Sequence, residues 1–355
     1  SHWASESHFP ALRAHPDVEL TAVCTRSAAS AEEARKAFGA KLAFSDYREM
    51  VLSPEIDAVV VVVRVPSHFG PTKAAIEAGK PVYTEWPLTA TTAEAEELRA
   101  LARAKGVQTA IGLQSRVAPE MLYMKQLVET GYVGEVLACH VSTMRPGPLE
   151  RTLSRTWNGD VTQGANPLTI QAGHVIDALR FVAGDFASLG GMLATQAKQW
   201  YATDTKQMVD VTSPDNVLLS CQMKSGAVAS IHVANVPWAP SGYRMEIYGR
   251  EGTLVASHKV SSQHGNVRVQ GAQRGNELQD LPIPQGFAHV PADFPRGAAY
   301  NVGQMYALFA QAIRTGQSPS LMPTFDMAVE MHHLLDTIRK ASEAKQMLPW
   351  AYHAG

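Results

Sequence analysis

The chain has little of what marks membrane, secreted or nucleic-acid-binding proteins. Its 355 residues include three cysteines, and the formal net charge is -2 at pH 7. No apolar run approaches the roughly 20 residues of a membrane helix, and the first residues have neither the basic flank nor the apolar centre of a signal peptide. We therefore expect a cytoplasmic protein that binds small molecules, and neither nucleic acid nor a membrane.

The sequence also lacks a metal-binding pattern. Cys24, Cys139 and Cys221 are far apart and lie in apolar stretches, which predicts buried, inert thiols in a reducing compartment. His332 and His333 are adjacent on a predicted helix, about 100° apart, so they do not share a ligand geometry as an i, i+4 pair would. We expect no metal site.

What the first third of the chain does have is an alternation of strand and helix signals, which is typical of a parallel doubly wound sheet. Two predicted helices open with capping-box spacing, one at Ser30 and Glu33 and one at Thr91 and Glu94. The predicted strands are 18–25, 58–63, 81–85 and 107–112. The expected fold of this part is a Rossmann domain.

The pattern changes after about residue 118. Alternating apolar and polar residues with few helices between them predict a large, mostly antiparallel open sheet. Its predicted strands are 135–144, 187–195, 216–223, 227–236, 243–249 and 253–256. We thus predict a dinucleotide-binding domain at 1–118 and an α+β substrate and dimerisation domain at 119–355, with two late amphipathic helices packing back on the first domain. The segment 257–298 is expected to be a long irregular excursion.

A doubly wound sheet binds its ligand at the carboxyl ends of the strands, which selects the candidate cofactor contacts. An acidic residue after the second family strand would accept from a ribose 2′-OH, whereas an arginine neutralises a 2′-phosphate. Arg26 in this place favours NADP over NAD, the alternative being an exposed arginine on a turn. The full set of predicted contacts from the strand ends is Thr25, Arg26, Ser27, Val65, Pro66, His68, Glu85, Trp86, Gln114 and Arg116.

Several short motifs, in their order and spacing, resemble the Gfo/Idh/MocA family, named for glucose-fructose oxidoreductase and inositol dehydrogenase. They are V-R-V-P-S-H at 63–68, A-I-E-A-G-K-P-V at 75–82, E-W-P-L at 85–88, G-L-Q-S-R at 112–116 and V-G-E-V at 133–136. The resemblance implies a dinucleotide-binding domain, a sheet domain that holds a sugar or polyol, and a homodimer or homotetramer formed through the open face of the sheet.

The sequence departs from the family at its start. Members usually begin with a strand and a G-x-G-x-x-G type loop, whereas residues 3–12 resemble the helix that follows this loop. We therefore expect the first strand to be missing from the sequence and assign no phosphate-binding glycines. Trp3, in the resembling helix, is added to the predicted cofactor contacts.

A second departure concerns proton transfer. The resemblance implies a lysine at position 86 and a D-x-x-x-H pair, but this chain has Trp86, and Ile170 stands four residues before His174. Trp86 offers an aromatic wall without a titratable proton, or it fills the seam between domains. The E-W-P variant also resembles the branch of the family that contains the fungal galactose-pathway repressor.

His174 remains as the candidate catalytic residue, because an imidazole can take a proton from a carbinol as hydride leaves. Asp177, one turn further on, would orient the ring; the alternative is a histidine that only bonds inside the core. Predicted substrate contacts are Trp86, Trp157, Asn158, Asn166, Asp177 and Tyr300.

The sequence leaves more than one function open. The first hypothesis is an NADP-preferring oxidoreductase that transfers hydride between nicotinamide and a sugar, polyol or related carbonyl compound. The second is a non-catalytic dinucleotide-binding sensor or regulator, which the replacements at Trp86 and Ile170 favour. A redox-neutral lyase or glycosidase that uses bound cofactor transiently is the third.

Overall fold

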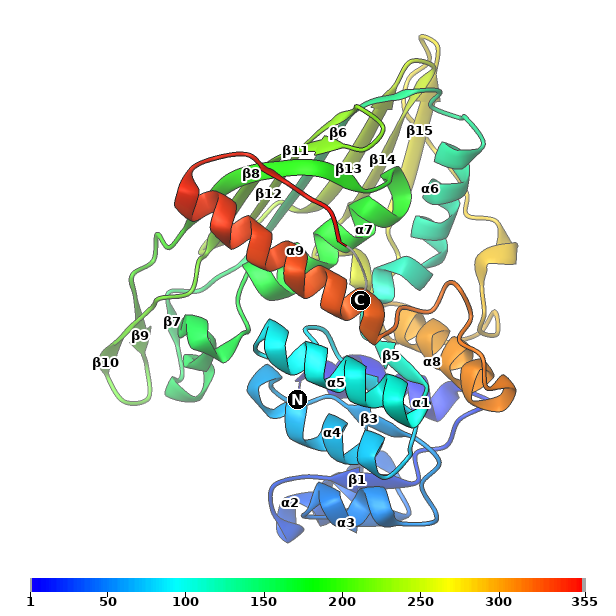
Figure 1. Cartoon of the computed structure of the whole chain (residues 1–355), viewed down its shortest axis with the longest axis vertical. Coiled ribbons are helices and arrows are strands. Elements are labelled where there is room, and N and C mark those ends of the chain that lie inside the picture. Colours follow the sequence, from blue (N-terminus) through cyan, green and yellow to red (C-terminus); the bar gives the residue numbers. More distant parts are fainter. Residues whose placement is uncertain (1, 353–355) are drawn as a thin grey trace. The chain divides into compact units, whose positions relative to one another are not determined.

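The structure, a computed structural model, describes residues 2–352 (Figure 1). The chain divides into two compact units. Unit 1 comprises the chain up to Val117 together with Ala288–Val329, and unit 2 comprises Ala118–Phe287 together with the chain from Glu330. Each unit is described by itself below.

Unit 1 is built on parallel strands with helices between them, as the alternation of signals predicts. Its strands are β1 (Ala22–Cys24), β2 (Leu42–Phe44), β3 (Val59–Val61), β4 (Val82–Thr84) and β5 (Thr109–Ile111). Its helices are η1 (Ala4–His8), α1 (Phe9–Ala14), α2 (Ala28–Phe38), α3 (Tyr47–Leu52), α4 (Phe69–Glu77), α5 (Thr92–Lys105) and α8 (Ala298–Thr315), with 3₁₀ turns η2 (Val65–Ser67) and η3 (Gln114–Val117).

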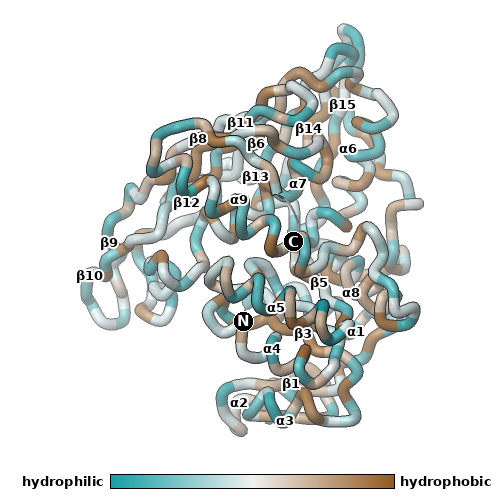
Figure 2. Tube along the Cα trace, in the orientation of Figure 1, coloured by the Kyte–Doolittle hydropathy of each residue, from teal (hydrophilic) through white to brown (hydrophobic). Residues whose placement is uncertain are grey.

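The strands of unit 1 form two sheets, β1–β2 and β3–β4–β5. A doubly wound sheet has its first strand between these two sets, and no strand within residues 2–352 joins β1 to β3. The core strand β3 is the hydrophobic stretch near the middle of unit 1 in Figure 2. The carboxyl ends of β1, β3, β4 and β5 therefore carry the expected contact segments.

The helix starts of unit 1 test the two capping predictions. Thr91 caps α5 in a complete capping box with Glu94, as predicted. The prediction for Ser30 is wrong: α2 begins three residues earlier, and Ser27 is its N-cap. Ser27 is extended and its hydroxyl accepts a hydrogen bond from the Ser30 amide at 3.2 Å, because the two alanines between them enter the helix readily.

Unit 2 contains the large sheet, with strand order β16-β15-β14-β13-β6-β12-β11-β8-β17. Most neighbours are antiparallel as predicted, but the central pair β6 and β12 is parallel. The strands are β6 (Val136–Pro146), β8 (Phe186–Ala194), β11 (Asn216–Met223), β12 (Val228–Val236), β13 (Gly242–Gly249), β14 (Gly252–His258), β15 (Arg268–Gln273), β16 (Gln279–Asp280) and β17 (Leu348–Pro349). The segment 257–298 is thus not wholly irregular, since it contributes two strands.

The remaining elements of unit 2 are helices on one face of the large sheet and a small second sheet. The helices are α6 (Pro119–Glu129), η7 (Leu168–Ala172), α7 (Gly173–Ala183), η8 (Ser262–His264), η9 (Gln285–Phe287) and α9 (Phe325–Ala344), of which unit 2 holds the part from Glu330, and short turns lie at η4 (Leu153–Arg155), η5 (Trp157–Gly159) and η6 (Val161–Gln163). The small sheet is β10-β9-β7 (Gln207–Asp210, Gln199–Ala202 and Glu150–Arg151).

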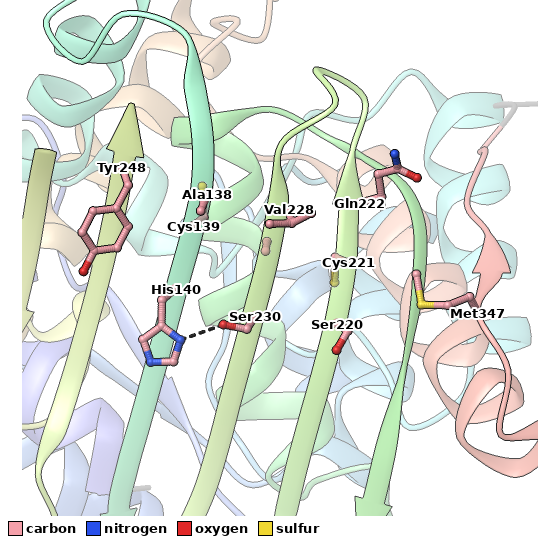
Figure 3. A pocket seen from close by; sticks show the side chains of 11 residues that line it. Ala138, Cys139, His140, Ser220, Cys221, Gln222, Val228, Ser230, Tyr248 and Met347 are labelled. Carbon is pink, nitrogen blue, oxygen red and sulfur yellow. Dashed lines mark hydrogen bonds between the residues drawn. The ribbon is translucent and has the colours of Figure 1, made fainter. Parts of the chain in front are cut away.

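The two faces of the large sheet differ in burial. Along β6, the buried residues Cys139, Val141 and Thr143 alternate with partly exposed ones, and α7 packs against this strand. The opposite face exposes Leu218, Val228 and other side chains, and carries a shallow hollow of about 620 Å³ (Figure 3). No helix of residues 2–352 is long and apolar enough to cross a membrane.

Candidate functional site

The first part of the candidate cofactor site is the turn that follows β1. Thr25 and Ser27 hold this turn: the Thr25 hydroxyl donates to the Ser27 carbonyl at 3.2 Å and lies 2.6 Å from the Ser30 hydroxyl. Arg26 lies at the tip, exposed, and its side chain makes no hydrogen bond or ion pair with any residue between 2 and 352. A rigid turn that presents an unpaired guanidinium at a strand end is suited to an anionic ligand.

The segment after β3, unlike the turn after β1, has its polar side chain bonded within the fold. His68 is buried, with Nδ1 2.8 Å from the Pro87 carbonyl and Nε2 3.2 Å from the Val63 carbonyl. Burial lowers the pKa of His68, which favours the neutral ring donating from Nδ1 to Pro87. His68 therefore ties the turn after β3 to the turn after β4. Of the neighbouring predicted contacts, Val65 is buried and Pro66 is exposed.

Glu85, directly after β4, is the centre of a buried polar network. Its carboxylate accepts hydrogen bonds from His8 Nε2 at 3.0 Å, from the Tyr83 hydroxyl at 2.9 Å, and from Gln114 Nε2 at 2.7 and 2.9 Å. His8 Nδ1 lies 2.7 Å from the Tyr306 hydroxyl and accepts from it when the ring is neutral. Three side chains, from η1, β4 and η3, thus bind one carboxylate, and Tyr306 from α8 supports His8.

Two further observations show how closely this network is built. Burial alone would raise the pKa of Glu85, but the hydrogen bonds and charge of His8, with the Gln114 and Tyr83 hydrogen bonds, hold it below its ordinary value. Gly112 passes directly over the carboxylate, since a Cβ at that position would lie 2.6 Å from Glu85 Oε2. Only glycine lets β5 approach so closely.

Trp86 follows this anchored carboxylate and is itself buried, with 4% of its surface exposed.

Gln114 has one buried polar atom that is unsatisfied: its Oε1 has no hydrogen-bond partner among the described residues. Trp3 packs against the core of unit 1, Arg116 in η3 is half-buried, and the predicted substrate contact Tyr300 lies in the same core, 6.3 Å from the Phe294 ring.

The candidate catalytic residue lies in unit 2. His174 is the second residue of α7, and α7 directly follows the π-helical turn η7, a feature that is frequent at functional sites. His174 is 5% exposed, and Asp177, one turn on, is fully buried. Ile170, which replaces the expected acid, is half-buried within the π-helical turn.

The other predicted substrate contacts of unit 2 have distinct surroundings. Asn166 is buried and its Oδ1 accepts from the Leu168 and Thr169 amides at 3.0 and 3.2 Å, so it caps η7. Asn158 is half-buried, and its buried Oδ1 has no partner among the described residues. Trp157 is half-buried in the same turn.

The structure adds polar residues that the sequence analysis missed. Arg145 is one residue beyond the predicted strand 135–144 and lies at the carboxyl end of β6. His264 belongs to η8, which packs against α7. Arg145 directly follows its predicted strand, as Arg26 does, but the strand-end rule applies to a doubly wound parallel sheet and was not used for the sheet predicted to be antiparallel. Nothing in the sequence marks His264, because its place depends on the tertiary packing of a long connection.

The residues of unit 1 fit a nicotinamide dinucleotide. The unpaired Arg26 guanidinium and the orphan Gln114 oxygen both follow strand ends, where this type of sheet binds nucleotides. By contrast, no group of three or more histidine, cysteine or acidic residues in the described part of the chain could hold a metal ion.

Comparison with known proteins agrees with the fold. Residues 2–113 match the family model described as an oxidoreductase family with an NAD-binding Rossmann fold, and residues 121–255 match the GFO/IDH/MocA C-terminal domain. The dehydrogenase aclE of Aspergillus oryzae is 32% identical over 66% of this chain and 67% of its own length. The galactose/lactose regulatory protein GAL80 of Saccharomyces cerevisiae is 24% identical over 86% of this chain and 75% of its own length.

Among solved structures, a levoglucosan dehydrogenase in complex with NADH and levoglucosan has the same fold, with a TM-score of 0.85. It is 22% identical, and the match covers 98% of this chain and 96% of that one. The two family models together cover most of the chain, in the order that the motifs predict. The chain belongs to the GFO/IDH/MocA family of oxidoreductases with an NAD-binding Rossmann fold.

Proposed function

We propose that the protein is a dehydrogenase that prefers NADP and acts on a carbinol carbon of a sugar or related polyol. The observation that carries the proposal is that the chain contains both an exposed, unpaired Arg26 at a strand end of unit 1 and a buried histidine and aspartate on α7 of unit 2. Relatives support the substrate class, since one is a levoglucosan dehydrogenase and another a dTDP-sugar 3-reductase.

Each residue has a specific role in this proposal. Arg26 pairs with the 2′-phosphate, and the Gln114 oxygen accepts a hydrogen bond from the carboxamide end of the dinucleotide. When bound, the nicotinamide supplies the hydride acceptor. His174 takes the proton of the substrate hydroxyl, and Asp177 stabilises the charge that this ring gains. Trp86 contributes an aromatic wall and no proton.

The anchored Glu85 gives Trp86 a fixed starting point. Because Glu85 is held by three side chains, the backbone that leaves β4 has little freedom where Trp86 begins. A wall that positions a ring must be rigid to be useful, since a displacement of about 1 Å costs roughly 10²-fold in rate.

Steady-state kinetics on a panel of sugars and polyols with NADP and NAD test the proposal. His174→Ala should lower kcat by roughly 10²-fold or more, the usual scale of general acid–base catalysis, and should leave NADP binding nearly unchanged. Trp86→Ala should raise KM or Kd more than it lowers kcat, because it removes binding surface and no proton donor.

A second function has its own support. The replacements at Trp86 and Ile170, together with the similarity to GAL80, favour a dinucleotide-binding regulator that does not turn over. If no sugar or polyol gives NADP reduction and His174→Ala changes neither ligand binding nor stability, the dehydrogenase proposal fails and the regulator becomes the better account.

A further inference from the structure

The carboxyl end of β6 brings two polar side chains together in unit 2. Arg145 on β6 is the register partner of Asn235 on the parallel strand β12. Both residues follow the alternation of Val141, Thr143 and Val233, which are buried on the face that α7 covers. Arg145 and Asn235 therefore extend from the helix-covered face, at the edge where β6 and β12 end.

Neither side chain has a partner. Within residues 2–352, the Arg145 guanidinium and the side-chain amide of Asn235 make no hydrogen bond or ion pair. Both residues are half-buried. Burial lowers the pKa of Arg145, and no carboxylate is close enough to raise it. Withdrawing a charge from water without a partner is unfavourable, and such groups are usually explained by a ligand.

The neighbourhood of Arg145 includes the candidate catalytic helix. His264 in η8 lies close enough to Arg145 and His174 to be affected by their charges: burial, followed by the charges of Arg145, His258 and His174, together lower its pKa to about 4. The His264 ring lies 6.1 Å from the His258 ring, and its Nδ1 is 2.6 Å from the Ser261 hydroxyl. The corner formed by Arg145, Asn235 and His264 thus holds neutral donors and one fixed positive charge near His174.

A glycine after β6 leaves room for the Asn235 side chain. Gly147 carries the chain across β12 directly after β6, and a Cβ at this position would lie 2.6 Å from Asn235 Cβ. A larger residue would displace the loop or Asn235, and so change the spacing between the two polar side chains.

We propose that Arg145 and Asn235 bind a carboxylate carried by the substrate, so that the sugar-like substrate of this protein is a sugar acid. One guanidinium supplies a single charge and two parallel donors, which match a carboxylate, and the Asn235 amide supplies a further donor. A phosphate ester, with about twice the charge, would call for more cations than this corner holds. The inference rests on the proposed dehydrogenase function for the identity of the site.

Calorimetry with matched probes tests the inference. D-Gluconate and D-glucuronate are compared with the uncharged D-glucitol and D-glucose, and with D-glucose 6-phosphate, on the full chain in the presence of NADP. We expect at least one acid to bind roughly 10- to 100-fold more tightly than its neutral counterpart. Arg145→Gln should remove this preference, and Arg145→Lys should retain part of it.

Arg244→Gln is the matched control, because Arg244 lies on the same sheet but pairs with Glu246 at 2.8 Å and is exposed. It should keep the full preference for the acid. Circular dichroism melting confirms that each variant folds. Equal binding of acid and neutral probes by the unmutated protein, or an unchanged preference in a folded Arg145→Gln variant, would overturn the inference. Tighter binding of the phosphate ester through Arg145 would replace the carboxylate with a phosphate.

The result does not depend on turnover. An acid that binds through Arg145 but is never oxidised would contradict the dehydrogenase proposal and leave the binding site standing. Oxidation of neutral polyols by an unmutated protein that binds acid and neutral probes equally would do the reverse.

Discussion

The Glu85 carboxylate in unit 1 is buried and the Arg145 side chain in unit 2 is half-buried, and within residues 2–352 only Glu85 has hydrogen-bond partners. Glu85 accepts from His8, Tyr83 and Gln114, and its pKa is held below the ordinary value despite burial. Arg145 has no partner among the described residues. A buried charge with all its hydrogen bonds made stabilises the fold, whereas a half-buried charge without a partner is available to bind a ligand.

The comparison predicts which substitutions change stability and which change binding. Substitutions in the closed network, which is Glu85 with His8, Tyr83 and Gln114, should lower the free energy of unfolding with no ligand present. Substitutions of polar side chains that have no partner should weaken ligand binding and leave the free energy of unfolding nearly unchanged.

The largest effect is expected for the closed network. Glu85→Ala leaves His8, Tyr83 and Gln114 without their shared acceptor, and should lower the free energy of unfolding by about 3–5 kcal/mol in urea titrations at pH 7. Glu97→Gln is the control, because Glu97 is an exposed partner of Lys73 and should change stability by less than about 1 kcal/mol. A loss for Glu85→Ala no larger than that of the control would contradict a closed network.

The same network predicts a pH dependence. The pKa of folded Glu85 lies below its ordinary 4.5, so its contribution to stability is present above pH 4.5 and is lost as pH falls through the folded pKa. Glu85→Gln should therefore flatten the loss of stability below pH 4.5, measured by thermal unfolding. If the loss of stability below pH 4.5 is unchanged in this variant, that loss comes from other carboxyl groups.

A smaller effect is expected at Arg26, whose guanidinium, like that of Arg145, has no hydrogen-bond or ion-pair partner among the described residues. Arg26→Ala should weaken NADP binding by roughly 10- to 100-fold, leave NAD binding unchanged and leave the unfolding midpoint in place. Arg103→Ala is the control, since Arg103 is already paired with Asp326 at 2.9 Å. Calorimetry measures both affinities, and equal affinities of the unmutated protein for NADP and NAD would refute the preference.

The smallest effect extends the comparison to apolar groups without partners. The open face of the large sheet exposes Leu218 and Val228, and we expect it to be covered in a homodimer or homotetramer. Val228→Ala should weaken dimerisation by about tenfold, because each copy loses buried methyl groups, whereas Leu52→Ala, exposed in unit 1, should not. A stable monomer of the unmutated protein at micromolar concentration in light scattering would exclude this interface.

Local patterns explain much of what the sequence predicted correctly. The capping box at Thr91 and the Val59–Val61 strand depend on neighbours within a few residues, and both are present. The prediction at Ser30 failed for an equally local reason: Ser27 offers the same hydroxyl three residues earlier and caps first.

Long-range packing explains what could not be predicted. The parallel pairing of β6 with β12 joins segments about 90 residues apart, and periodicity within either segment is the same for both strand directions. The strands inside 257–298 and the place of η8 beside α7 likewise depend on the sheet that they join.

By itself, the sequence determined the family, the two kinds of sheet and the residues at the strand ends, because each of these is written in local composition and ordered motifs. Only the tertiary structure decided which polar groups are satisfied. Glu85 and Arg145 are both charged residues at strand ends, and nothing in their local sequence distinguishes them. His8 and Gln114 reach Glu85 from distant segments, whereas no side chain of the described chain reaches Arg145, and that difference exists only after folding.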